Sequence, residues 1–270
     1  MATLSDRRAR ADKRERHERI LRDLKLHAAI RVSDLARELG VTTETIRRDL
    51  DELGESGSLN RTYGGAALPP AQHEPAFQER QLSMVEERSR IGAAAADLVN
   101  NGQILMIDAG STALHFARHL ASAARTLTVI TNFLPAAMTL SVNSAIRVIL
   151  CPGDYNAQEH GVFGPHTIDF IRRFNADHAI IGASGLDPLG ASDALTEAVG
   201  VKRAMMERAQ RKTLLVDAGK HDAVFLERVC PLNDLTDIVT DRAPRGALAD
   251  AISASGVTLH VAPKTKSGAR

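Results

Sequence analysis

The chain has few of the residues on which several common classes of protein depend. Its 270 residues include two cysteines, no tryptophan and only 3% aromatic residues. Cys151 and Cys230 lie far apart, without a CxxC motif or a histidine at metal spacing, so neither a zinc site nor a disulfide framework is predicted. We expect both thiols to be reduced and buried. The low aromatic content argues against binding of single-stranded nucleic acid by stacked rings.

Long apolar runs and a strong excess of one charge are also missing from the sequence. No run approaches the length of a membrane span, and no apolar stretch follows the basic N-terminus as it would in a signal peptide. We therefore expect a cytoplasmic protein without a membrane partner. The net charge of +1 argues against a surface that coats nucleic acid along its whole length. The first 31 residues nevertheless hold ten Lys or Arg against five Asp or Glu. This arm either contacts phosphates or is simply solvated.

What the sequence does contain, from residue 33 onward, is the pattern of a helix-turn-helix. Residues 33–39 predict a short helix that Ser33 caps and Gly40 ends. Thr42 or Thr43 caps a second helix, in which apolar residues recur about once per turn. These apolar residues are Ile46, Leu50 and Leu53. A longer helix is expected upstream, over 14–29, with Ile20, Leu21, Leu24 and Leu26 on its apolar side.

The other face of the second helix carries side chains suited to reading DNA. They are Thr43, Thr45, Arg47 and Arg48, near the end that contacts base edges in a recognition helix. Arginine binds guanine or phosphate, and threonine contacts a thymine methyl group or a phosphate oxygen. Residues 58–65 then predict a small hairpin, or wing, with Arg61 and Tyr63 on it. Two surface helices with solvated charges are the alternative, and the hairpin that follows them favours the DNA-reading interpretation.

Beyond a stretch punctuated by prolines, short apolar runs alternate with helical segments. We assign 1–68 to a DNA-binding domain, 69–80 to a linker and 81–270 to a second domain. A helix is predicted over 84–100. The apolar runs that follow cover 103–108, 127–131, 147–150, 178–182, 213–217, 237–240 and 257–261, the last as an edge strand. Short β-branched runs between helices predict a doubly wound α/β domain with a parallel sheet covered on both faces.

Polar residues gather where the predicted strands give way to helices, which is where open α/β sheets bind ligands. They are Asp108, Gly110, Ser111 and Thr112 after the first run, Thr131 and Asn132 at the second, Gly153 after the third, the segment 182–185 after the fourth, and Asp217 and Lys220 after the fifth. A glycine and hydroxyls beside free helix N–H groups form an anion site. Ordinary turn chemistry explains any one of these turns, but together they favour a small phosphorylated ligand.

Lys220 is the obvious positive charge for such a ligand. Lys202 and Arg203 are second candidates, although such a pair more often belongs to a solvated helix face. No cofactor and no metal ion are expected. A general base for catalysis would have to be Asp108, Glu197 or Asp217, and a turn-capping role explains each aspartate.

Three segments of the DNA-reading part resemble the signature of the DeoR family of bacterial sugar-metabolism repressors. They are Val41–Thr42, Thr45–Leu50 and the spaced set Arg61, Gly64, Gly65 and Ala66. The resemblance implies a winged helix-turn-helix joined to an effector domain of the ribose-5-phosphate isomerase type, which senses sugar phosphates. The family's D-x-G-[ST]-T, T-N and D-x-[ST]-K elements map onto Asp108 to Thr112, Thr131 to Asn132, and Asp217 to Lys220. The run 161–171 is similar to the glycerol-3-phosphate repressor branch.

Four positions depart from the family pattern. Paired glycines after the third strand appear here as Pro152 and Gly153, and a basic residue that often follows is Asn156. Gly219 replaces a hydroxyl, and Arg88 replaces a lysine. Each change removes or moves a possible phosphate partner, so the identity of the effector stays open.

These features predict a repressor of a carbohydrate or polyol operon that is not an enzyme. Its affinity for double-stranded operator DNA would depend on a phosphorylated sugar or polyol. A homodimer or homotetramer is expected, because one DNA-binding domain (the head, residues 1–68) reads too few base pairs to be specific. The alternatives are a sugar-phosphate isomerase or deaminase with a DNA-binding appendage, and an architectural DNA binder without a ligand. The latter leaves the polar strand ends unexplained.

Overall fold

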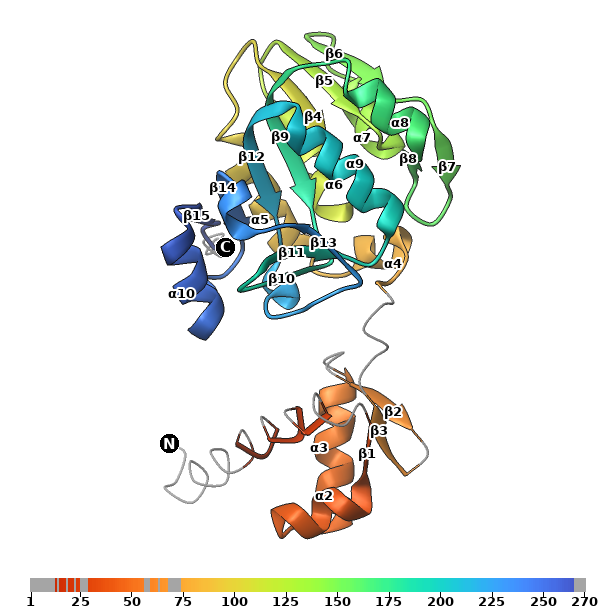
Figure 1. Cartoon of the computed structure of the whole chain (residues 1–270), viewed down its shortest axis with the longest axis vertical. Coiled ribbons are helices and arrows are strands. Elements are labelled where there is room, and N and C mark those ends of the chain that lie inside the picture. The colour runs from red at the N-terminus through yellow and green to blue at the C-terminus, as the bar shows by residue number, and fades with distance from the viewer. Residues whose placement is uncertain are drawn as a thin grey trace, which may run out of the picture. The chain divides into compact units, whose positions relative to one another are not determined.

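The chain divides into two compact units, residues 1–73 and 74–270 (Figure 1). The computed structural model describes residues 13, 15–17, 19–21, 23, 24, 29–55, 59–62, 64–67 and 74–264. The boundary between the units falls within the predicted linker, 69–80. Residues 74–80 of that stretch belong to the second unit, where the side chains of Phe77 and Arg80 are buried. Residues 69–73 lie outside the described ranges.

The first unit combines helices with a small antiparallel sheet. Helices α2 (Val32–Leu39) and α3 (Thr43–Glu55) form the helix-turn-helix. Gly40 between them has φ 64°, a left-handed conformation that favours glycine. Strand β3 (Gly65–Ala67) pairs with β1 (Ala29–Arg31) on one side and with β2 (Asn60–Thr62) on the other. The predicted winged helix-turn-helix is therefore confirmed.

The apolar residues predicted for the first unit form its core. Ile20, Leu24, Ile46, Leu50 and Leu53 are all buried, and the described residues between 13 and 24 are helical. One local prediction is wrong, because Arg31 and not Ser33 precedes α2, and no side chain caps the helix. The N–H of Val32 instead bonds to Gly64 O at 3.0 Å, so a strand leads directly into the helix. Leu26 and Tyr63 lie outside the described residues.

The second unit is built on a seven-stranded parallel sheet in the order β15-β14-β12-β9-β4-β5-β6. Its strands are β4 (Ile104–Ile107), β5 (Leu127–Thr131), β6 (Ile146–Leu150), β9 (Ala176–Gly182), β12 (Ala209–Leu215), β14 (Asp237–Thr240) and β15 (Thr258–Val261). All seven predicted runs are strands of this sheet, and the last one lies at its edge. The predicted doubly wound sheet is confirmed.

Helices cover both faces of the sheet. Helices α5, α6 and α7 pack together on one face, and α8 and α9 pack together on the other (Figure 1). The helices of this unit are α4 (Phe77–Leu82), α5 (Val85–Ala96), α6 (Ser111–Ala121), α7 (Leu134–Leu140), α8 (Pro165–Ile171), α9 (Thr196–Glu207) and α10 (Gly246–Ser255), with the short 3-10 turns η1 (Ala218–Lys220) and η2 (Leu232–Asp234). In the part of the chain that the structure describes, no helix combines the length and apolarity that crossing a bilayer requires.

Two small sheets lie beside the main one. Strands β10 (Gly185–Asp187), β11 (Gly190–Asp193) and β13 (Glu227–Cys230) form an antiparallel sheet. Strands β7 (Asp154–Asn156) and β8 (Gly161–Phe163) form a hairpin.

The strand order reverses at β4, and this reversal positions the candidate ligand site. β4 pairs with β5 on one side, where Ile107 lies opposite Thr131, and with β9 on the other, where Ile107 lies opposite Ile180. In open α/β sheets ligands bind outside the carboxyl ends of strands at such a switch point. Residues that directly follow β4, β5 and β9 therefore converge on one place.

Candidate DNA-binding face and effector site

The first half of α3 presents the predicted DNA-reading residues to solvent. Thr42 precedes the helix, and its hydroxyl accepts a hydrogen bond from the N–H of Thr45 at 3.2 Å. Arg47 and Arg48 have side chains that are 57% and 79% exposed, and they pair with Glu44 at 3.5 and 3.9 Å. Exposed pairs at these distances contribute little to stability. Both guanidinium groups are therefore available to an outside partner.

Arg61 on the wing is held differently. Its Nε lies 2.8 Å from Asp51 Oδ1, and its Nη1 donates to Gly65 O at 2.9 Å. These contacts fix the wing arginine against α3 and against its own hairpin. A phosphate that contacts Arg61 must therefore share it with two partners within the head.

Asp49 is a buried charge of the head that the sequence analysis missed. It lies on the inner face of α3 and accepts two hydrogen bonds from Arg16, at 2.5 and 2.9 Å, and one contact from His17 at 3.0 Å. Burial alone would raise the pKa of Asp49, but Arg16 and His17 lower it below its usual value. The cluster ties the first helix to the inner face of α3. Its sequence signal is a carboxylate three residues after Ile46, within an apolar stripe.

Two buried oxygens mark the candidate effector site in the second unit. Asp108 and Asn132, which directly follow β4 and β5, are both fully buried. Each has one side-chain Oδ1 without a hydrogen-bond partner. The other end of the Asn132 amide donates to Val162 O at 3.1 Å. Buried acceptors normally have a donor, so these two atoms fit a ligand that brings hydroxyl groups.

The start of α6 lies beside the same strand ends. Gly110 precedes the helix, and Ser111 and Thr112 form its first turn, with both side chains buried. The first backbone bond back into the helix runs from Leu114 N to Gly110 O. The N–H groups before Leu114 have no acceptor within the helix. Such a helix start favours an anion through its free donors and its dipole.

Lys202 corrects the expectation that it belongs to a solvated helix face. Its side chain is only 4% exposed, and Nζ lies 2.7 Å from Asp108 Oδ2 and 3.3 Å from Asp193 Oδ2. Burial would lower the pKa of Lys202, but the two carboxylates raise it, so the ammonium stays protonated. Burial raises the pKa of Asp108, and Lys202 opposes this effect. One buried ammonium is thus shared by two buried carboxylates at the end of the sheet.

Lys220 follows β12, as predicted, but it already has an acidic partner. Its Nζ lies 2.7 Å from Glu74 Oε1 and donates to Ala183 O at 2.6 Å. Glu74 also accepts a hydrogen bond from the hydroxyl of Ser184. Neither Glu74 nor its contact with Lys220 was predicted from the sequence.

Two other predicted residues, Thr131 and Gly153, have local structural contacts. The hydroxyl of Thr131 donates to Ile107 O at 2.6 Å and accepts from Phe133 N–H at 3.1 Å, so it joins two strand ends. Gly153 lies at φ 151°, and a Cβ there would come within 2.0 Å of Thr167 Oγ1.

Asp217 caps the turn η1 through Gly219 N–H at 3.1 Å and pairs with Arg88 at the same distance. Arg88, one of the departures from the family pattern, is therefore committed to a buried ion pair.

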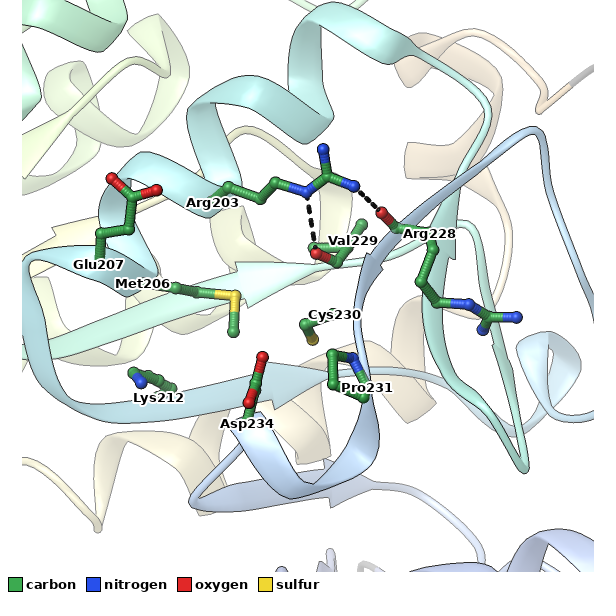
Figure 2. Close-up of a pocket in the computed structure, with 9 residues that line it drawn as sticks. All are labelled: Arg203, Met206, Glu207, Lys212, Arg228, Val229, Cys230, Pro231 and Asp234. Carbon is green, nitrogen blue, oxygen red and sulfur yellow. Dashed lines mark hydrogen bonds between the residues drawn. The ribbon is translucent and has the colours of Figure 1, made fainter.

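A pocket of about 400 Å³ lies elsewhere, between α9, β13 and η2 (Figure 2). Two of the cations that line it, Arg203 and Arg228, already have partners within the protein. Arg203 donates to the carbonyl oxygens of Val229 and Arg228 and pairs with Glu227 at 2.9 Å, as Figure 2 shows for the two carbonyls. Arg228 pairs with Asp187. Lys212, Glu207 and Asp234 also line this pocket, so it carries charges of both signs. Within the described ranges, no group of three His, Cys, Asp or Glu side chains is placed to hold a metal ion.

Comparison with protein families gives one match for each unit. Residues 16–72 match the model for the DeoR-like helix-turn-helix domain. Residues 83–242 match the model for the DeoR C terminal sensor domain.

Characterised relatives match over most of the chain. The glycerol-3-phosphate regulon repressor of Escherichia coli K12 is 33% identical over 234 residues, which are 85% of this chain and 91% of that protein. The repressor GlcR of Bacillus subtilis is 32% identical over 92% of this chain and 95% of its own length.

Solved structures give a weaker likeness. Ribose 5-phosphate isomerase A of Methanocaldococcus jannaschii has a TM-score of 0.38 at 19% identity and covers 50% of this chain and 53% of that one. A likeness of this size says nothing about activity.

Proposed function

The chain belongs to the DeoR family of transcriptional repressors, and from that premise we propose that a phosphorylated sugar or polyol controls its affinity for operator DNA. The second unit binds this effector at the ends of β4 and β5. The first unit binds DNA through α3 and the wing. A coupling free energy of about 1–3 kcal/mol between the two sites is enough for a useful switch.

The pair of unpartnered buried oxygens, Asp108 Oδ1 and Asn132 Oδ1, carries the effector part of this proposal. They lie on neighbouring strand ends and fit the hydroxyl groups of a polyol. The start of α6, at Gly110, Ser111 and Thr112, supplies free N–H donors for a phosphate group. A site that offers acceptors for hydroxyl groups and donors for a phosphate group fits a sugar phosphate better than a free sugar or an inorganic anion.

Glycerol 3-phosphate is the first effector to test. Three relatives are named as glycerol-3-phosphate regulon repressors, and they match 85%, 85% and 86% of this chain. The smallest phosphorylated polyols also suit a site whose polar groups are few and close to the sheet. The departures at Asn156 and Gly219 leave room for a different phosphorylated compound, so a panel is required.

We propose that Thr43, Thr45, Arg47, Arg48 and Arg61 contact the operator. The protein would act in the cytoplasm as a homodimer or homotetramer. One winged head contacts too few base pairs for a specific site, and helix-turn-helix proteins usually pair their heads on symmetric half-sites. Light scattering at micromolar concentration, with and without operator, measures the assembly, and a monomer in both conditions contradicts this part of the proposal.

Relatives of this chain are named as repressors, and catalysis is not part of the proposal. Asp108 is the best-placed candidate for a general base, yet its second oxygen is bound to Lys202. A turnover assay on sugar phosphates separates the two functions. Product formation at a catalytic rate would show that the protein is an enzyme and would contradict its proposed role as a sensor.

A thermal-shift screen against sugar phosphates tests the proposed effector site. A ligand at a hundred times its Kd stabilises the native state by about 2.7 kcal/mol. We expect the phosphorylated compound to raise the melting temperature of the wild type, and Thr112→Val to reduce this rise. An unphosphorylated sugar that shifts the transition, when no phosphorylated compound does, would contradict the phosphate site.

A further inference from the structure

Glu74 is a partly buried carboxylate at the very start of the second unit, and two cationic groups and a hydroxyl lie around it. Lys220 Nζ lies 2.7 Å from Glu74 Oε1, and the hydroxyl of Ser184 donates to Glu74 Oε2. Arg80 Nε lies 3.7 Å away. The Glu74 side chain is 15% exposed. Two cationic groups and a hydroxyl donor around one carboxylate form the kind of environment that a protein offers to an anionic ligand.

This carboxylate is also joined to the candidate effector site by direct contacts. Ser184 Oγ lies 3.1 Å from Asp193 Oδ1. Asp193 pairs with Lys202 at 3.3 Å, and Lys202 pairs with Asp108 at 2.7 Å. A continuous chain of polar contacts therefore runs from Glu74 to the carboxylate of Asp108, whose other oxygen, Oδ1, has no partner.

We propose that Glu74 is a tethered anion that occupies a subsite formed by Lys220 and Ser184, and that the phosphate group of the effector, bound between this subsite and the start of α6, displaces it. This inference rests on the proposed function and adds the anion subsite and the event that binding triggers. A phosphate monoester carries up to two negative charges and more acceptor oxygens than a carboxylate. It is therefore a stronger partner for Lys220 and Ser184 than Glu74 is.

Displacement of Glu74 would loosen the segment 74–76, which we call the strap. The strap leads directly into α4, where Phe77 N–H donates to Gln158 O at 3.1 Å. The ring of Phe77 packs edge-on against Phe133, the residue after Asn132, with ring centres 5.2 Å apart. The strap is thus held at Glu74 by Lys220 and Ser184, and the residue that follows it, Phe77, is held by Gln158 and Phe133. It is also where the chain arriving from the first unit enters the second, so its release is a direct route from effector binding to the DNA-binding head.

Burial alone would raise the pKa of Glu74, but Lys220 and Arg80 lower it to about 2. The carboxylate therefore stays charged throughout the physiological range. Competition by another anion, and not protonation, is the means by which it leaves the subsite.

Hydrogen exchange of the full-length wild type, followed by mass spectrometry, tests the displacement directly. The three arms are glycerol 3-phosphate, inorganic phosphate and glycerol. Glycerol 3-phosphate should speed exchange at Ala76 and Phe77 by about tenfold or more, because the strap opens locally. Glycerol, which lacks the anion, should leave this exchange unchanged. Inorganic phosphate should act in the same direction as glycerol 3-phosphate but at higher concentration. Slower or unchanged exchange in the presence of saturating glycerol 3-phosphate overturns the proposal.

The variant Glu74→Gln tests the competition through affinity. Removal of the tethered charge should tighten binding of glycerol 3-phosphate by about tenfold, as expected when a competitor leaves about a tenth of the molecules open for binding. Glu79→Gln is the matched control, because Glu79 is exposed on α4. This substitution should leave the Kd for glycerol 3-phosphate unchanged. If Glu74→Gln does not fold, the exchange measurement on the wild type decides.

The outcomes distinguish this inference from the function on which it rests. If the wild type binds glycerol 3-phosphate and Glu74→Gln binds it with the same or lower affinity, the tethered anion is overturned. The effector site itself is then still supported. Failure of every phosphorylated compound to bind both proteins overturns the effector site and the tethered anion together. Binding by Glu74→Gln with none by the wild type supports the displacement in its strongest form.

Discussion

The two units use charged residues in opposite ways. On α3, Arg47 and Arg48 are largely exposed and pair only weakly with Glu44. At the strand ends of the second unit, Asp108, Lys202 and Asp193 are buried and hold one another at 2.7 and 3.3 Å. The exposed charges cost the fold little and are free for a large anionic partner. The buried charges are part of the fold, so a small ligand that binds there must rearrange contacts that already exist.

This difference predicts that charge removal has its largest effect on stability in the buried cluster. Lys202→Met leaves two buried carboxylates without their ammonium and should destabilise the second unit by about 3–5 kcal/mol. The neighbouring Arg203 is half exposed, and Arg203→Met should cost less than about 1 kcal/mol. Urea unfolding of both variants gives the comparison. Equal losses would show that Lys202 is not the centre of the buried cluster.

Asp49 is the exception within the first unit, because it is a buried charge behind an exposed face. Asp49→Asn should destabilise the first unit by about 1–3 kcal/mol, since it weakens charge-assisted bonds to Arg16 and His17. The surface pair of Asp51 with Arg61 provides the control, and Asp51→Asn should cost less than about 1 kcal/mol. Unfolding of the isolated residues 1–73 or of that unit in the full chain provides the measurement. A smaller effect at Asp49 than at Asp51 would contradict the role of the cluster.

The same carboxylate predicts a pH dependence for the first unit. The pKa of Asp49 is lowered in the folded protein from its usual value of 3.8. Its contribution to stability is therefore fully present above pH 3.8 and is lost as the pH falls through the lower, folded value. Stability measured across this acidic range should fall more steeply in the wild type than in Asp49→Asn. Parallel curves would rule out Asp49 as the source.

On the exposed face, substitution should affect DNA binding and spare the fold. Arg47→Ala and Arg48→Ala should each weaken operator binding by about 1–3 kcal/mol if a base contact is lost. Their free energies of unfolding should stay within about 0.5 kcal/mol of the wild type. Binding is measured at one fixed salt concentration on an operator obtained by sequence selection. Unchanged affinity in both variants would show that α3 is not the recognition helix.

The smallest effect is expected at Arg61. Its guanidinium is held by Asp51 and Gly65 O, so Arg61→Ala should weaken operator binding by less than about 1 kcal/mol. A loss as large as that of Arg48→Ala would mean that Arg61 leaves these partners for a phosphate when DNA binds.

Much of the fold was predictable because its signals are local. Short apolar, β-branched runs predicted all seven strands of the main sheet, and apolar residues at helical spacing predicted the core of the first unit. Gly40 predicted the turn between the two helices because its left-handed backbone favours glycine. Capping of α2 by Ser33 was wrong because a long-range bond, from Val32 N–H to Gly64 O, decided where that helix begins.

The candidate site was only partly predictable, because pairing of charges depends on the three-dimensional fold. Asp108, Ser111, Thr112 and Asn132 follow strands, so the rule for open sheets located them. Lys202 was only a second candidate for the ligand's positive charge, because an adjacent Lys and Arg pair more often belongs to a solvated helix face. Its position four residues after Ala198 places it on the buried side of α9. Glu74 lies 146 residues before its partner Lys220, and no local pattern connects them. Such contacts follow from topology and not from spacing.

Operator affinity measured with and without glycerol 3-phosphate, in the wild type and in Thr112→Val, decides whether the buried site controls the exposed face. We expect the compound to change wild-type affinity by about five- to 150-fold, which corresponds to a coupling of 1–3 kcal/mol. Thr112→Val should bind operator normally without the compound and respond to it less. If glycerol 3-phosphate is inactive, each phosphorylated sugar of the screening panel takes its place in the same assay. Wild-type affinity that stays constant with every phosphorylated compound, on an operator that the protein binds specifically, would contradict the link between the two units.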